Sequence, residues 1–139
     1  MLVPQAKEIE SILNTDMEEL QKTLKGISNT NLMDSFAKNF TYLNDYRPTK
    51  KSIQSEIIID FSYVYITEIR IRLEKIARQG NKAAMLEFVY LINRLYKEDK
   101  SIELTYMTRN LMRIRREAER WLETTFNMDK KAMRKEWIR

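Results

Sequence analysis

The chain has 139 residues, 43% of them hydrophobic, which is the length and composition of one domain with one core. Two glycines and two prolines leave little material for tight turns and favour long helices. The absence of cysteine and histidine excludes disulfides, thiolate nucleophiles, Cys/His zinc sites and imidazole acid–base chemistry. We therefore expect an all-α protein, a compact single-domain bundle of five to six helices that spans residues 1–139.

The 25 basic and 20 acidic residues give a net charge of +5, which favours polyanionic partners, although a simply well-solvated surface would carry the same charge. No apolar run approaches the roughly 20 residues that a membrane-spanning helix needs. The start of the chain, MLVPQAKEIE, lacks the basic-then-apolar plan of a signal peptide. We expect a cytoplasmic protein with no membrane partner.

The first apolar stripe predicts one helix over about residues 5–25, closing at Gly26. Its weak point is the segment Asn14-Thr15-Asp16, because Thr15 followed by Glu18 has the form of a capping box. We favour one helix over about residues 5–25; the alternatives are a helix that is interrupted at this segment and a helix that begins there.

A second helix begins near Ser28, whose hydroxyl can cap it, and ends ahead of Arg47, because the residue before Pro48 is disfavoured in the α region. Its apolar face carries Leu32, Phe36, Phe40 and Leu43. The segment Tyr46 to Ser52, with Lys50 and Lys51, is then the longest loop and a basic one.

The longest periodic segment predicts a helix over about 53–79 that Gly80-Asn81 ends. The group Ile57-Ile58-Ile59 is β-prone when taken alone, but apolar residues continue at spacings of three or four as far as Ile76. Apolar residues fill more than one stripe of this helix, so we expect it to be the central one.

Three further segments are helical. The spacing of Ala84, Phe88, Leu91 and Leu95 predicts a helix over about 82–97, and the next helix runs over 102–126. Asn127 can take the left-handed conformation that ends it. Asp129 then begins a short basic helix that either docks through Trp137 or frays.

The helix over 102–126 has two faces of opposite character. Its apolar side chains recur at spacings of three and four residues: Met107, Leu111, Ile114, Ala118 and Trp121. The arginine row, as we call it, follows the same spacing on the opposite side: Arg109, Arg113, Arg116 and Arg120. Because successive side chains turn by about 100°, burial of the apolar face directs the arginine row outward.

Acids four positions on can neutralise two arginines of this helix, in the pairs Arg113–Glu117 and Arg115–Glu119. Arg109 and Arg116 instead have arginines four positions on, and such like charges repel by roughly 0.2–0.5 kcal/mol. The row advances roughly 16 Å at about 1.5 Å per residue, and a planar guanidinium suits phosphate oxygens. We expect it to contact several backbone phosphates; the alternative is a row paired with acids of neighbouring helices or of another subunit.

A second basic set lies around the end of the central helix and consists of Arg70, Arg72, Arg78 and Lys82. Glu68 and Glu74 dilute this set, and Lys50 and Lys51 can join either set across the bundle. The chain has no RNP aromatic signature, no KH-type GxxG loop and no zinc finger. These residues fit a contact with the nucleic-acid backbone better than the recognition of particular bases.

Patterns of catalysis are missing from the sequence. It has neither a GxGxxG fingerprint nor a phosphate-cradling GxxxxGK loop. Adjacent acids such as Glu18-Glu19 and Glu98-Asp99 point in different directions from a helix, and a di-metal bundle would need Glu-x-x-His pairs. We expect no catalytic residues, no metal, no cofactor and no enzymatic activity.

From Gly26 to about Ile92 the order of features resembles the small, non-catalytic Csm-type subunit of type III CRISPR effector complexes. A Gly-Ile-Ser-Asn-Thr-Asn-Leu helix start leads to an aromatic helix ending near Tyr42, and after a polar gap a long Tyr/Ile-rich helix finishes in Ile76-Ala77-Arg78. Lys82 to Phe88 opens another helix. The resemblance implies a helical bundle that lines up with copies of itself and other subunits along guide RNA and target, touching the backbone through basic residues.

The leading expectation is therefore a non-catalytic structural subunit that binds the RNA backbone in a CRISPR-type ribonucleoprotein. One alternative is a filament or capsid protein that packages double-stranded DNA on its basic faces. Another is a protein-interaction bundle whose arginine row meets an acidic partner. The residues of the arginine row would serve all three.

Overall fold

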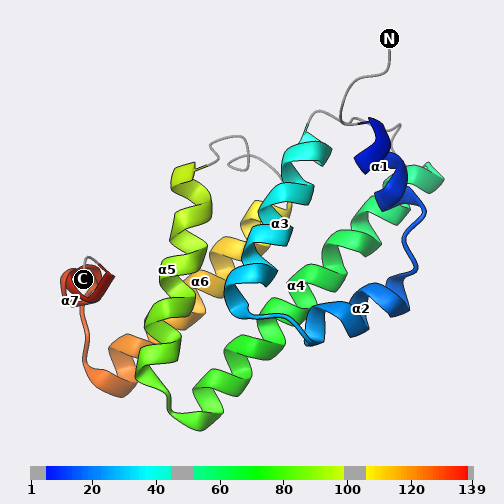
Figure 1. Cartoon of the computed structure of the whole chain (residues 1–139). Coiled ribbons are helices and arrows are strands. Elements are labelled where there is room, and N and C mark those ends of the chain that lie inside the picture. Colours follow the sequence, from blue (N-terminus) through cyan, green and yellow to red (C-terminus); the bar gives the residue numbers. More distant parts are fainter. Residues whose placement is uncertain (1–5, 45–51, 99–105, 138–139) are drawn as a thin grey trace.

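The computed structural model describes residues 6–44, 52–98 and 106–137, and these form seven α-helices and no strand. The helices are α1 (Ala6–Leu13), α2 (Met17–Lys25), α3 (Asn29–Asn44), α4 (Ile53–Gln79), α5 (Lys82–Glu98), α6 (Tyr106–Phe126) and α7 (Lys130–Trp137). Figure 1 shows them gathered into a bundle, which confirms the all-α prediction. Seven helices in the described residues is one more than the five to six expected, because the segment predicted as the first helix forms two.

The break between α1 and α2 corrects the prediction of one helix over residues 5–25. Asp16 has an extended backbone, and its carboxylate accepts hydrogen bonds from the backbone amides of Glu18 and Glu19 at 3.0 and 3.3 Å. Thr15, the expected cap, instead donates its hydroxyl hydrogen to the carbonyl of Ser11. Because the helix is broken there, the first amides of α2 have no intrahelical partners, and the cap at Asp16 satisfies two of them.

The described ends of the other helices lie close to the predicted ones, whereas the predicted start of the helix over 102–126 lies outside the described residues. Ser28 accepts a hydrogen bond from the amide of Asn31 and Ser52 from that of Ser55, so each caps the helix that follows it. Gly80 ends α4 at a φ of 62°, in the left-handed region that favours glycine, and Asn127 follows α6 at a φ of 55°. Residues 45–51, which include Lys50 and Lys51 of the predicted basic loop, lie outside the described residues.

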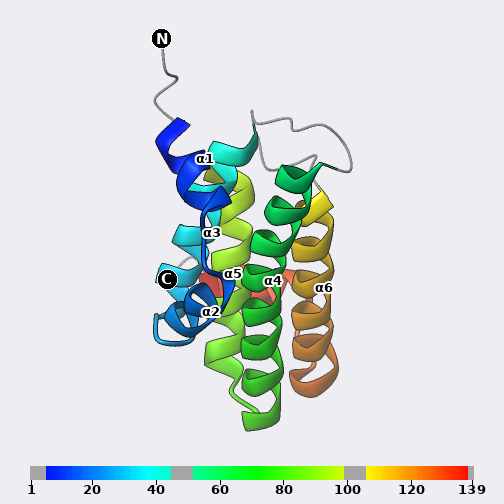
Figure 2. The same ribbon diagram turned by 90° about the vertical axis from the view of Figure 1, so that its right-hand side faces the viewer.

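Helix α4 is central, as predicted: it packs on α1, α2, α3, α5 and α6. Figure 2 looks onto α4 with α2 on one side and α6 on the other. The core combines aliphatic, methionine and aromatic side chains from all these helices, among them Ile12, Leu24, Phe36, Ile69, Phe88 and Leu122. The second apolar stripe of α4 is not buried, however, because Ile59, Tyr63 and Ile71 are each at least 40% exposed.

The last helix docks on α5. Met133 of α7 is fully buried and Met128, in the preceding turn, is 7% exposed, so these two thioether side chains anchor the segment. Asp129 caps α7 by accepting a hydrogen bond from the amide of Ala132 at 2.7 Å, as its place in the sequence predicts. The side chain of Trp137, the expected anchor, lies outside the described side chains.

A partly buried polar cluster joins α3 to α4 around the buried side chain of Tyr65. The hydroxyl of Tyr65 is 2.6 Å from that of Ser35 and accepts a hydrogen bond from the side-chain amide of Asn39 at 3.0 Å. Burial raises the pKa of Tyr65 above its ordinary value, and the hydrogen bonds with Ser35 and Asn39 partly oppose that rise. The cluster therefore holds a protonated tyrosine against the edge of the Phe36 ring, 5.9 Å away between centroids.

Tyr65→Phe should lower the free energy of unfolding at neutral pH by about 1–2 kcal/mol, because two buried hydrogen bonds are lost. The unfolded tyrosine loses its proton at a lower pH than the folded one, so the native protein loses this contribution as pH rises above about 10, toward the raised pKa of the folded state. Urea denaturation at about pH 7, 9 and 11 would show the difference between the two proteins narrowing at the highest pH. A constant difference across that range would contradict the assignment.

Candidate nucleic-acid interface

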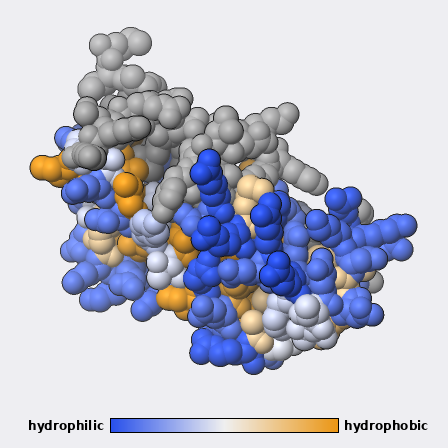
Figure 3. Space-filling model, turned by 180° about the vertical axis from the view of Figure 1, so that it is seen from behind, coloured by the Kyte–Doolittle hydropathy of each residue, from blue (hydrophilic) through white to orange (hydrophobic). Residues whose placement is uncertain are grey.

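Helix α6 separates a buried face from a basic one. Leu111, Ile114, Ala118 and Leu122 are fully buried, and on the opposite side all four members of the arginine row are exposed: Arg109, Arg113, Arg116 and Arg120. Figure 3, the view from behind, shows the most hydrophilic side chains gathered in the middle of this face, over α6. The predicted helical phase is confirmed for Leu111, Ile114 and Ala118, whereas the side chain of Met107 lies outside the described ones. Trp121 is only partly buried, and Leu122 takes the core position expected for it.

Two acids beside the arginine row, Glu117 and Glu119, form ion pairs with residues outside it. Glu117, the expected partner of Arg113, lies 2.9 Å from the guanidinium of Arg70 on α4. Arg115 pairs with Glu119 at 3.7 Å, as predicted, and donates to the side-chain oxygen of Asn93 at 3.0 Å. Within the part of the chain that the structure describes, none of the four arginines of the row has an ion pair with an acid.

Arg72 of the second basic set is a structural residue, which corrects its prediction as a phosphate contact. Its guanidinium donates hydrogen bonds to the carboxylate of Glu68 at 3.1 Å, to the side-chain oxygen of Asn29 at 2.9 Å and to the carbonyl of Leu24. The side chain is 12% exposed and that of Glu68 is 7% exposed. These bonds join α4 to the end of α2 and the start of α3, so the donors of Arg72 are turned away from solvent.

The other members of the second set are spread over the bundle. Arg70 is half-exposed and reaches α6 through Glu117, beside the arginine row. Lys82, at the start of α5, places its ammonium 5.6 Å from the centroid of the Phe126 ring, at the end of α6. Arg78 is exposed near the end of α4. The structure therefore brings Arg70 and Lys82 to α6 and does not gather the set into a patch of its own.

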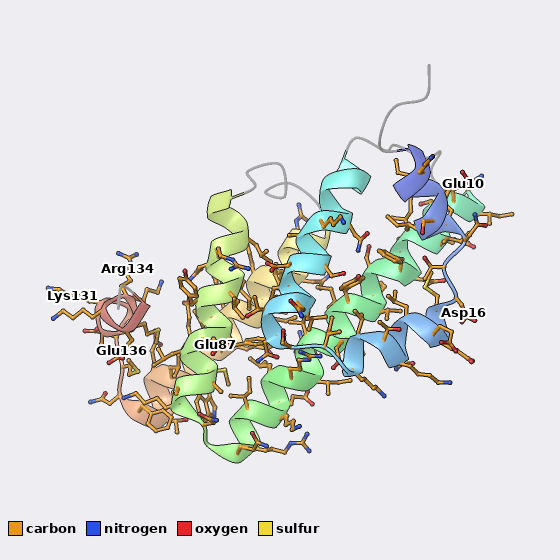
Figure 4. The ribbon with its side chains drawn as sticks, viewed as in Figure 1. Glu10, Asp16, Glu87, Lys131, Arg134 and Glu136 are labelled. Atoms are coloured by element: carbon orange, nitrogen blue, oxygen red, sulfur yellow. The ribbon has the colours of Figure 1, made fainter. Side chains whose placement is uncertain are left out.

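A group of cations that the sequence analysis did not include lies on α7: Lys130, Lys131, Arg134 and Lys135, all exposed. Figure 4 shows Lys131 and Arg134 directed away from the bundle, at the end opposite Glu10 and Asp16. The high density of lysine and arginine after Asp129 is the feature of the sequence that could have indicated this group. These side chains point away from the body of the protein, on a helix that follows the arginine row along the chain.

The arrangement suits the binding of an extended anion. Exposed guanidinium groups form charge-assisted hydrogen bonds with phosphate oxygens, and a straight helix spaces them at regular intervals. Among the described side chains no three acidic residues lie close enough together to hold a metal ion. Over the same residues, no helix has both the length and the apolar composition needed to cross a membrane.

Comparison with protein families, with curated proteins and with solved structures finds no significant match to this chain.

Proposed function

We propose that this chain is a non-catalytic, nucleic-acid-binding structural subunit whose arginine row follows the phosphate backbone. The observation that carries the proposal is the isolation of four exposed arginines on one face of α6, without ion pairs to acids in the described part of the chain. Like charges at this spacing oppose helix formation slightly, and a bound polyanion removes that cost.

The contact is expected to be indifferent to base sequence. Phosphate contacts position a protein on nucleic acid, whereas base reading needs side chains that reach the base edges. The row advances roughly 16 Å along α6, which is enough for several phosphates of one strand. Arg70, beside the row, adds a fifth guanidinium when its bond with Glu117 opens.

RNA is the proposed partner, in a CRISPR-type ribonucleoprotein of the cytoplasm. The support for RNA over DNA is the resemblance in the segment from Gly26 to about Ile92 to the small subunit of type III effector complexes. In such an assembly, a basic bundle without catalytic residues supports the guide RNA and its target beside other subunits. Arg72 takes no part in this proposal, since its donors are used within the bundle.

The test is the salt dependence of binding, measured by fluorescence anisotropy with a labelled single-stranded RNA. For about four phosphate contacts, log K should fall with log salt with a slope of about −3. A double-stranded DNA of equal length and polyglutamate serve as competitors. A slope near zero would contradict phosphate binding, tighter binding of the duplex would favour DNA packaging, and equal competition by polyglutamate would favour an acidic protein partner.

A further inference from the structure

One row of four side chains on α4 faces solvent although three of them are hydrophobic. Ile59, Tyr63, Thr67 and Ile71 follow each other at a constant spacing of four residues, and so lie along one ridge of the helix. Ile59 is 44% exposed, and Tyr63 and Ile71 are each 40% exposed. Single exposed apolar residues are ordinary, but an aligned set on the central helix of a bundle is typical of an interface.

Beside this ridge lies a shallow groove of about 320 Å³ between α2 and α4. Tyr63, Thr67 and Ile71 line its α4 side, and Met17 and Gln21 of α2 line the other. The groove is open to solvent and its lining is mostly apolar, although Glu18 and Asp60 also line it, so it can take side chains from a helix that lies along α4. Its occupant has to match a face that is apolar at the centre and charged toward both ends.

The charges on this face of α4 change sign along the helix. The first half carries the exposed acids Glu56 and Asp60, and the second half carries the exposed cations Lys75 and Arg78, directly preceded by the exposed acid Glu74. No ion pair with another described residue involves any of these five side chains. Apart from Glu74, the pattern is acidic, then apolar, then basic, with Thr67 at its middle.

We propose that the occupant is a second copy of this chain, packed through α4 against α4 about a two-fold axis near Thr67. A two-fold interface uses the same patch on both copies, so the patch has to complement itself when one helix runs antiparallel to the other. Position i then faces position 134 minus i. Tyr63 falls opposite Ile71, and Glu56 falls opposite Arg78, while Thr67 faces its own copy.

This arrangement leaves the arginine row free. The row projects from the side of α6 opposite its buried residues, whereas the proposed interface lies on the outer face of α4, so each copy keeps its row exposed. Two positions do not match across the axis: Asp60 falls opposite Glu74 of the second copy, and Ile59 falls opposite Lys75. Because the arginine row takes no part in the interface, the association does not depend on nucleic acid. Relief of the repulsion between Asp60 and Glu74 should strengthen the dimer.

Thr67→Cys tests the axis directly, because the chain has no cysteine of its own. Helices packed about 8–10 Å apart, with Cα atoms about 2.3 Å from each axis, bring two facing residues close to the Cα separation of about 4.4–6.8 Å that a disulfide needs. Mild oxidation without nucleic acid should link this variant into a dimer rapidly. Thr125→Cys, exposed on α6, is the matched control. Equal rates of cross-linking for both variants would overturn the proposed axis.

Sedimentation equilibrium of the unmodified chain and two variants tests whether this face of α4 forms the dimer. The unmodified chain should show a reversible monomer–dimer equilibrium, Ile71→Glu should be monomeric, and Glu74→Lys should lower the dimer dissociation constant several-fold. The substituted side chains are exposed, so circular dichroism should show intact helices. A chain that is monomeric throughout, or a dimer that Ile71→Glu leaves unchanged, would overturn the proposal, and neither result would bear on RNA binding by α6.

Discussion

Replacement of the arginine row by glutamine should reduce the salt dependence of RNA binding by about 3 in the slope of log K against log salt. The variant carries Arg109→Gln, Arg113→Gln, Arg116→Gln and Arg120→Gln. Each arginine that neutralises one phosphate of a single strand contributes about 0.7 to that slope, and four such contacts are removed. Affinity at low salt should fall by orders of magnitude, since counterion release supplies most of a sequence-indifferent affinity. Anisotropy titrations at several salt concentrations provide the measurement.

A control variant with the same loss of charge separates a specific contact from net charge. Lys7→Gln, Lys22→Gln, Lys25→Gln and Lys38→Gln remove four exposed cations from α1, α2 and α3. This variant should keep nearly the whole salt slope, although its net charge equals that of the arginine-row variant. Both should keep the circular dichroism of the unmodified chain, because all eight side chains are exposed. Equal losses in the two variants would mean that only the net charge matters.

The helices were predictable wherever one periodic pattern was sufficient to define them. The segments that became α3, α4, α5 and α6 carry apolar residues at spacings of three and four over many turns, and tertiary packing strengthens that local preference. The break before α2 could not be predicted in the same way, because two neighbouring residues could each cap a helix there. Thr15 and Asp16 both offer a capping oxygen, and the choice of Asp16 depends on backbone geometry that the sequence does not show.

The sequence was sufficient to predict which side of α6 carries the exposed arginines, but not which residues form ion pairs around them. Opposite phases of apolar and basic residues on one helix determine which side is outward, and the exposure of all four arginines follows. The partner of Glu117 is 47 residues away, in Arg70 on α4, and no spacing within α6 indicates it. Arg72 shows the same limit more sharply, since its partners Asn29 and Leu24 come from other helices.

The double apolar character of α4 shows how an ambiguous pattern was resolved. An apolar stripe on each side of a helix predicts burial all round, and the structure places one stripe in the core while Tyr63 and Ile71 face solvent. Five helices, α1, α2, α3, α5 and α6, pack on α4, yet Tyr63 and Ile71, which line the groove beside α2, stay 40% exposed. A hydrophobic pattern of this kind shows that a face of the helix favours burial, but not whether the same chain or a partner buries it.

Arg72→Met should cost about 3–5 kcal/mol of folding free energy, which makes it the most destabilising of the substitutions considered for the basic residues. The methionine keeps most of the apolar stem but leaves the carboxylate of Glu68, 7% exposed, without its ion pair. It also leaves the side-chain oxygen of Asn29 and the carbonyl of Leu24 without this donor at the junction of α2 and α3. Urea denaturation followed by circular dichroism measures the loss.

Arg70→Met, two residues away on the same helix, is the matched control. Its ion pair with Glu117 has side chains that are 37% and 44% exposed, and exposed pairs of this kind contribute about 0–1 kcal/mol. Adding Glu68→Gln to Arg72→Met should restore part of the lost stability, because the buried charge without a partner is then removed. If Arg72→Met cost no more than Arg70→Met, the guanidinium of Arg72 would be available to solvent, and its exclusion from the phosphate-binding residues would be wrong.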